Sequence, residues 1–222
     1  MRSNIQSLLR VEDSFGAWFM TTGIIVQFAV FLLSKETLLS LVSGIAGVVS
    51  VVLCSQRKPS FYFWSLLQIG TFVVISRNCG LYGKLVENMF YVGTLLVGFL
   101  HWKLHLTEEK VDTRQMTLTA WRLTLLATTV CYIMAYFFLS QAGGTHPALD
   151  GFTTVFAIGA QLLMIFRYAE NWFLWFIVDV ACIILFTKVG DWCMVAQYLF
   201  WTANCIYGYL KWKVKEQPNA TK

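Results

Sequence analysis

Long apolar stretches separated by short polar links make up most of this chain. An α-helix needs about 20 mostly apolar residues to cross a bilayer, and eight stretches come close to that length. They cover residues 15–33, 37–54, 60–76, 81–102, 118–139, 149–168, 172–187 and 191–212. The pattern therefore predicts an all-α integral membrane protein with eight transmembrane helices.

Two parts of this pattern need separate interpretation. The stretch at residues 15–33 has the position of a secretory signal peptide, but it is long for one and no small-residue cleavage site follows it. We therefore expect it to be a helix. The link at residues 103–117 is longer than the others and rich in charges, so we expect a polar loop there.

Composition excludes several classes of protein. Of the 222 residues, 57% are hydrophobic and 13% are charged, whereas soluble domains carry about 25% charged residues. The six cysteines form no CxxC pair, and His101 and His105 have no clear third ligand, so we expect neither a metal nor a cofactor. A Walker A motif and a GxSxG elbow are both absent from the sequence, which argues against ATP-driven transport and serine hydrolysis.

The net charge of +5 is segregated along the chain. With eight crossings, the N-terminus, every second link and the C-terminus share one side of the membrane. That side holds 13 basic residues: Arg2, Arg10, Arg57, Lys58, Lys103, Lys110, Arg114, Arg122, Arg167, Lys211, Lys213, Lys215 and Lys222. The other side holds four: Lys35, Arg77, Lys84 and Lys188. The positive-inside rule predicts that both termini are cytoplasmic, and the basic balance indicates topology rather than nucleic-acid binding.

An internal repeat relates residues 80–103 to residues 190–213 at an offset of 110. At an offset of 111, Trp64 and Gln68 match Trp175 and Asp179. We expect two parallel three-helix repeats at residues 37–103 and 149–213, a loop and linker helix at 104–148, a peripheral helix at 1–36 and a cytoplasmic tail at 214–222. Small-solute transporters with parallel repeats bind their substrates near mid-membrane, between the repeats.

Polar and aromatic residues inside a predicted span are candidates for a functional site. Trp172, Trp175 and Asp179 fall within about 60° of one another on one helix face, and Asn171 lies at the edge of that face. Two indole rings beside a carboxylate suit a flat cationic or electron-poor ring. The alternative is an interfacial tryptophan belt plus an aspartate that bonds to a neighbouring helix.

The last predicted helix repeats this pattern with Gln197, Trp201 and Asn204 on one face, where the amides suit ligand amide and hydroxyl groups. The alternative role for these amides is polar contact between helices. In the first repeat the candidates are Trp64, Gln68, Glu87, Tyr91 and Thr94. Lys84 lies one turn from Glu87, so that pair could instead be structural.

The segment at residues 167–175, RYAENWFLW, resembles the PnuC family of bacterial vitamin transporters. The resemblance continues to Trp212 and covers most of residues 43–213. It implies nicotinamide riboside uptake into the cytoplasm by facilitated diffusion, after which a cytosolic kinase traps the substrate by phosphorylating it. It also implies a three-one-three helix core like that of the SWEET sugar transporters, with residues 15–33 as an extra helix, and a homotrimer in the inner membrane lipid.

Other functions stay open at this level. Relatives that import thiamine or riboflavin have the same fold, and Asp179 stands where some members have Asn. A membrane enzyme would need an activated nucleophile, metal or acid–base pair that the sequence does not offer. A receptor or scaffold would have no evident use for duplicated polar and aromatic faces in mid-membrane.

Overall fold

The computed structural model of the chain describes residues 13–34, 37–107 and 110–213. This part contains eight α-helices and one short hairpin. The helices are α2 (Ser14–Ser34), α3 (Leu38–Ser55), α4 (Phe61–Asn78), α5 (Tyr82–Leu104), α6 (Leu118–Gln141), α7 (Pro147–Ile165), α8 (Asn171–Val189) and α9 (Trp192–Lys213). The hairpin pairs β1 (Leu106–Thr107) with β2 (Lys110–Val111). The predicted tail at 214–222 and the first twelve residues lie outside the described residues.

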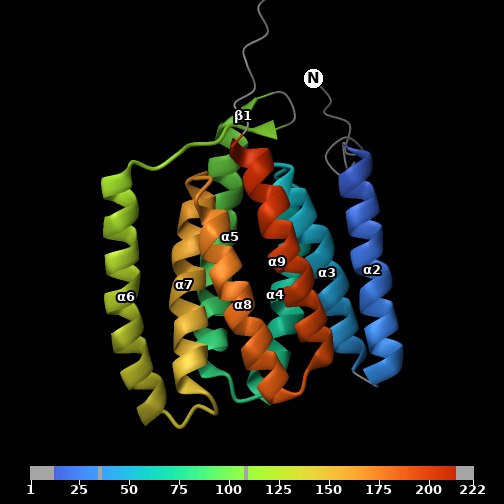
Figure 1. Cartoon of the computed structure of the whole chain (residues 1–222), viewed down its shortest axis with the longest axis vertical. Helices are drawn as coiled ribbons and strands as arrows, with labels where there is room; N and C mark the ends of the chain where they lie inside the picture. Colours follow the sequence, from blue (N-terminus) through green and yellow to red (C-terminus); the bar gives the residue numbers. More distant parts are fainter. Residues whose placement is uncertain (1–12, 35–36, 108–109, 214–222) are drawn as a thin grey trace, which may run out of the picture.

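The helices run side by side, and each runs opposite to the one before it (Figure 1). The start of α2, the end of α9 and the hairpin lie together at one end of the bundle, which we call the hairpin end; the opposite end is the far end. Five helices, α2, α3, α6, α7 and α8, are long and apolar enough to cross a membrane by length and composition. The chain is thus an all-helical protein with several apolar helices suited to a membrane.

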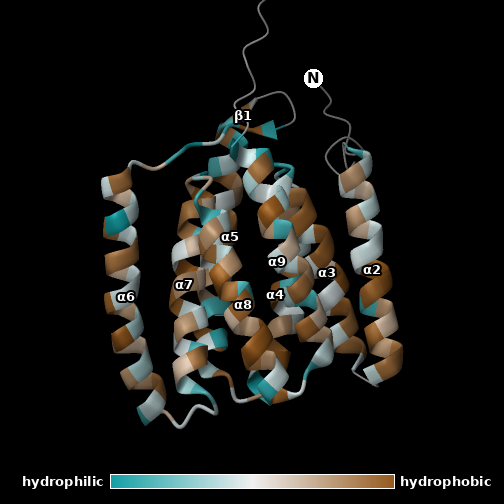
Figure 2. Ribbon diagram, viewed as in Figure 1, coloured by the Kyte–Doolittle hydropathy of each residue, from teal (hydrophilic) through white to brown (hydrophobic). Residues whose placement is uncertain are grey.

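Hydrophobic residues extend along most of each helix, and hydrophilic residues gather at the two ends (Figure 2). Large apolar side chains point outward along the helices, such as Phe63 on α4 with 79% of its surface exposed and Met89 on α5 with 74%. Soluble proteins rarely expose apolar surface on this scale, so the outer surface is suited to contact with lipid.

Six helices form a closed ring with neighbours in the order α3, α4, α5, α7, α8, α9 and back to α3. Unit one is α3–α5 and unit two is α7–α9. The first helix of each unit packs against the third helix of the other, which gives two equivalent seams, α3/α9 and α7/α5. The turn after α3 and the turn after α7 carry positive φ at equivalent residues, with 61° at Arg57 and 66° at Arg167, 110 residues apart.

Each seam is closed at the hairpin end by a tryptophan at an equivalent position. The indole N–H of Trp102 donates to the Met164 carbonyl at 3.1 Å, and that of Trp212 donates to the Cys54 carbonyl at 3.2 Å. Met164 and Cys54 are also 110 residues apart, and their sulfur atoms lie 3.5 Å from each other. The offset of 110 therefore relates equivalent tertiary contacts of the two units as well as similar residues in the sequence.

The two helices outside the ring are attached differently. Helix α2, predicted to be peripheral, packs against both α3 and α9 and buries Gln27. At its start, Asp13 accepts a hydrogen bond from Tyr207 and forms an ion pair with Lys211 on α9. Helix α6 packs mainly against α7 and buries only Thr128 among its residues, so α6 is the more exposed of the two.

At the far end the two seams differ. Asp150 in the first turn of α7 accepts hydrogen bonds from the backbone N–H groups of Gly83 and Lys84 at 2.7 and 3.0 Å. It thereby caps the start of α5 from the other unit, and it is buried. The equivalent residue of unit one, Ser40, instead pairs with Thr37 at the start of its own helix.

We predict that Asp150→Ala lowers the stability of the protein by roughly 1–3 kcal/mol, because two buried N–H groups lose their acceptor. Asn at this position should restore most of the loss, since Asn caps helices nearly as well as Asp. The measurement is the apparent Tm of the detergent-solubilised protein. Ser40→Ala is the matched control, and an equal loss of Tm in both variants would contradict the assigned role of Asp150.

Candidate functional site

A cavity of about 110 Å³ lies inside the ring and is lined by residues from all six of its helices. One water molecule needs roughly 10–15 Å³ on such a measure, so the cavity can hold a water cluster or a small solute in its place. The polar and aromatic residues that line it are Ser50, Phe61, Tyr62, Ser65, Gln68, Phe72, Glu87, Asn88, Tyr91, Gln161, Trp172, Trp175, Asp179, Tyr198 and Trp201.

Aromatic rings form much of the wall. The rings of Tyr91 and Trp175 lie 6.4 Å apart across the boundary between α5 and α8. Trp201 is held by a hydrogen bond from its indole N–H to the Gly47 carbonyl at 3.2 Å. Trp172 packs on Gly208, where an added Cβ would lie 2.5 Å from the indole ring. The glycine is therefore required for α9 to approach α8 this closely.

Two carboxylates face the cavity in different settings. Glu87 is paired with Lys84 at 2.7 Å, and both side chains are almost fully buried. Asp179 is 2% exposed and accepts a hydrogen bond from the Cys205 thiol at 3.3 Å. Its other oxygen, Oδ1, has no hydrogen-bond partner within the described part of the chain. The pair of Lys84 and Glu87 is neutral overall, so Asp179 is the lining acid available to a cationic ligand.

Further polar atoms at this wall also lack protein partners. Among the described residues, no hydrogen bond is made by the Tyr62 hydroxyl or the Trp172 indole N–H. Buried polar groups are nearly always hydrogen-bonded in native proteins. Unpaired donors and acceptors at a cavity wall mark positions where waters or ligand groups bind.

Seven of the twelve predicted site residues line the cavity: Gln68, Glu87, Tyr91, Trp172, Trp175, Asp179 and Trp201. The predicted face of Trp172, Trp175 and Asp179 is thus brought to one cavity. Glu87 lines the cavity and pairs with Lys84, so the structural pairing is present and contact with a substrate stays a prediction.

The other five predicted residues lie elsewhere. Asn204 donates to the Ser55 hydroxyl at 2.7 Å and ties α9 to α3, which is the helix-contact alternative. Asn171 donates to the Tyr168 carbonyl at the start of α8. The remaining three are Trp64 and Thr94, outside the lining, and Gln197, whose buried amide lies against Gly47 behind the cavity wall.

Sequence reasoning missed several lining residues, among them Tyr62, Asn88 and Tyr198. An offset of 110 applied to α4 would have found Tyr62, because it pairs Tyr62 with Trp172. Each packs against a glycine, Gly98 and Gly208, and these glycines are themselves 110 apart. The offset of 111, which paired Trp64 with Trp175, placed α4 one residue out of register. Asn88 reaches the cavity from α5 while donating to the Lys84 carbonyl at 2.6 Å.

The described residues contain no cluster of three or more His, Cys, Asp or Glu side chains that could hold a metal ion. The His101 and His105 rings lie 4.5 Å apart near the end of α5, where His105 hydrogen-bonds to the His101 carbonyl.

Together the ring and its polar, aromatic cavity define a helical membrane protein built from two similar units around a small-molecule site. Residues 37–214 match the sequence model of the nicotinamide mononucleotide transporter family, and the chain belongs to this family, that of the PnuC transporters. It is 30% identical to the nicotinamide riboside transporter PnuC of Neisseria mucosa over 90% of this chain and 84% of that protein. The corresponding protein of Haemophilus influenzae is 31% identical over 85% of each chain. A crystal structure described as the vitamin B3 transporter PnuC superposes with a TM-score of 0.86 at 29% identity, covering 96% of both chains.

We predict that Gly208→Ala destabilises the protein by roughly 1–3 kcal/mol, because the new methyl group overlaps the packed Trp172 ring. Gly93→Ala is the control, since an added Cβ there meets nothing within 4 Å, and helix propensity alone should leave it neutral or slightly more stable. Thermal unfolding of both variants in detergent is the measurement. Equal stability of the two would show that α8 and α9 are not in close contact at this glycine.

Proposed function

We propose that this protein moves nicotinamide riboside across the bacterial cytoplasmic membrane. The single observation that best supports this function is the cavity wall, where Trp172, Trp175 and Trp201 lie near the unpaired oxygen of Asp179. Nicotinamide riboside is a flat pyridinium cation with a carboxamide and a ribose. Indole faces bind electron-poor rings, a carboxylate attracts the cation, and the lining amides and hydroxyls can bond the carboxamide and sugar.

The charge of the cavity favours the riboside over the mononucleotide in the family's description. Among the described lining residues there is no lysine or arginine, and the nearby Lys84 is already paired with Glu87. A phosphate monoester carries about −1.5 to −2 charges at neutral pH and would lie close to Asp179 and Glu87. The curated relatives are also named as riboside transporters.

Two other functions are weighed against this one. Thiamine is a cationic aromatic and would satisfy the same carboxylate, whereas riboflavin is neutral and would leave it unpaired. A receptor or scaffold of this fold would need no route through the ring. A binding panel separates the first two ligands, and a flux measurement separates transport from reception.

We further propose that all eight helices cross the membrane with the hairpin end in the cytoplasm. Nine described basic residues lie toward the hairpin end and three toward the far end. The nine are Arg57, Lys58, Lys103, Lys110, Arg114, Arg122, Arg167, Lys211 and Lys213, and the three are Arg77, Lys84 and Lys188. Helices α4, α5 and α9 carry more polar residues than a purely lipid-facing helix, and several of these residues face the cavity or a neighbouring helix. A homotrimer and functional coupling to a cytosolic kinase rest on the family resemblance alone.

The proposed transport mechanism is facilitated diffusion by a SWEET-like rocking of unit one against unit two around the cavity. The Trp102 and Trp212 hydrogen bonds close the seams at the hairpin end, and Asp150 bonds to α5 across one seam at the far end, so each end has its own contacts to break. Asp179, Lys84 and Glu87 are the acidic and basic side chains at the cavity among the described residues, and a cationic substrate would neutralise the Asp179 carboxylate. The cycle then needs no coupling ion.

We expect nicotinamide riboside to bind the purified protein at least about tenfold more tightly than nicotinamide mononucleotide, since one repelled charge costs more than the 1.4 kcal/mol that tenfold represents. Riboflavin should also bind more weakly than the riboside. Trp175→Ala should weaken riboside binding by about tenfold through the lost stacking. Calorimetric titration in detergent measures all of these.

The control is Trp18→Ala, which removes an indole that is 62% exposed on α2 and should leave affinity within about twofold. Mononucleotide binding as tight as riboside binding would overturn the assigned substrate. Parent-like affinity in Trp175→Ala would overturn the assigned site.

Reconstituted in liposomes, the protein should equilibrate nicotinamide riboside without ATP, sodium or a proton gradient. With no membrane potential imposed, the internal concentration should rise to the external one and stop. Radiolabelled uptake measures this directly, and Gly93→Ala serves as a folded control. Accumulation above the external level, driven by an imposed ion gradient and without internal trapping, would exclude facilitated diffusion.

A further inference from the structure

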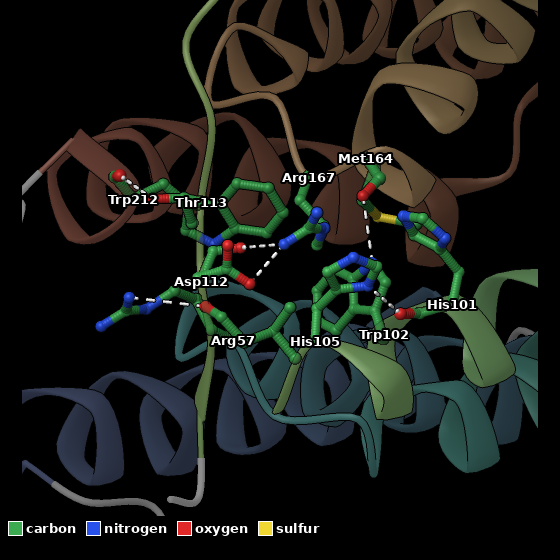
Figure 3. A network of polar contacts seen from close by, with 10 residues as sticks. Arg57, His101, Trp102, His105, Asp112, Thr113, Met164, Arg167 and Trp212 are labelled. Atoms are coloured by element: carbon green, nitrogen blue, oxygen red, sulfur yellow. Dashed lines mark hydrogen bonds and ion pairs between the residues drawn. The ribbon is translucent and has the colours of Figure 1, made fainter. Parts of the chain in front are cut away.

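A short segment, Lys110–Met116, crosses the hairpin end of the bundle between the two units (Figure 3). It consists of β2 and the residues that lead from β2 to the start of α6, and we call it the strap. The sequence predicted only a polar loop in this region. In the structure the strap makes specific contacts with the turns that end α3 and α7.

The contact with unit one is centred on Val111. The Val111 N–H donates to the Arg57 carbonyl at 3.2 Å, and the Arg57 guanidinium donates back to the Val111 carbonyl at 3.5 Å. The Val111 side chain is 1% exposed and belongs to the buried cluster that includes Leu53 and Trp102. The same cluster includes Met164 and Trp212 of unit two, so this nonpolar side chain of the strap lies where the two units meet.

The contact with unit two involves more bonds. The Arg114 N–H donates to the Arg167 carbonyl at 2.8 Å, and the Arg167 guanidinium forms an ion pair with Asp112. The Thr113 hydroxyl donates to the Trp212 carbonyl at 2.8 Å. Arg167 is itself buried. Unit two thus holds the strap through a buried arginine and several polar contacts, while unit one holds it through Val111, the hairpin pairing and the Asp112 N–H bond to the His105 carbonyl at 3.4 Å.

Arg57 and Arg167 are equivalent residues, so the strap binds the same turn twice, once in each unit. Only three peptide steps separate Val111 from Arg114, and an extended chain of that length spans at most about 11 Å. The two turns cannot move far apart while both contacts persist. Directly beneath the strap lie the Trp102 and Trp212 hydrogen bonds and the buried Cys54, which also lines the cavity.

We propose that the strap is the gate that closes the cavity at the hairpin end of the bundle. It holds the two units together in the closed state, and the Val111 contact with Arg57 breaks when the cavity opens to this side. The Asp112 ion pair with Arg167 positions Val111 and keeps the strap on unit two. The gate rests on the proposed function in one respect, namely that opening of the cavity at this end serves transport of the substrate.

The test uses Cys54 of the full chain as a reporter of opening, in the absence of any substrate. Inside-out membrane vesicles are treated with a membrane-impermeant maleimide, and mass spectrometry follows modification of the Cys54 peptide. Asp112→Asn weakens the ion pair with Arg167, and Val111→Ala removes buried side-chain packing. Each variant should therefore raise the population of the open state and speed the labelling by about two- to fivefold. Labelling in right-side-out vesicles should not increase.

Asp13→Asn is the matched control, because it breaks an ion pair with Lys211 at the same end without involving the strap; its labelling rate should equal that of the parent. The exchange Asp112→Arg with Arg167→Asp should return the rate toward the parent's, since Asp tolerates the positive φ at position 167. Should Asp112→Asn fold poorly, Val111→Ala decides the outcome alone.

Parent-like labelling in both folded strap variants would overturn the gate, as would an equal rise in Asp13→Asn. Because no ligand is present, failure of nicotinamide riboside to bind would leave this result unaffected. Normal riboside binding with unchanged labelling would reject the gate and leave the proposed function in place.

Discussion

Two tryptophan hydrogen bonds hold the two units of this protein together at the hairpin end. Trp102 reaches from unit one to the last turn of α7, and Trp212 reaches from unit two to the last turn of α3. They join the first helix of each unit to the third helix of the other, which closes the ring. A closed ring of six helices leaves a central space, and that space is the cavity. The position of the site therefore follows from how the units are joined.

Placing polar groups inside a membrane protein carries a free-energy cost that has to be offset. The Lys84 and Glu87 side chains neutralise each other, and the Asn204 amide nitrogen donates to the Ser55 hydroxyl on α3. Asp179 differs, because its Oδ2 accepts a hydrogen bond from the Cys205 thiol while its Oδ1 lacks a partner within the described residues. Such a group is retained at a cost when a ligand or water completes it. The Asp179 carboxylate, with one oxygen unpaired at the cavity, is thus the lining group most suited to a cationic substrate.

Much of this arrangement could be predicted from the sequence, because bilayer thickness sets helix length and charge follows topology. Helical periodicity placed Trp172, Trp175 and Asp179 on one face, and these three do line the cavity. The same periodicity put Asn204 on the face of Trp201, but Asn204 lies outside the cavity lining and bonds to α3, since one helix face can contact a neighbouring helix as well as a ligand. The alignment of α4 with α8 was one residue out of register, because it matched two tryptophans at an offset of 111. The packing of Tyr62 on Gly98 and of Trp172 on Gly208 relates the two helices at an offset of 110. The strap was not predictable, because its contacts join residues far apart in sequence.

The central claim is that the cavity inside the ring binds the pyridinium ring of nicotinamide riboside. Determining the structure of the protein with this ligand bound tests the claim most directly. The account predicts ligand density within the ring, with the pyridinium stacked on Trp172 or Trp175 and the Asp179 carboxylate beside it. Density outside the ring, for example in the groove that Trp121 and Phe173 form between α6 and α8, with the central cavity holding only water, would contradict it.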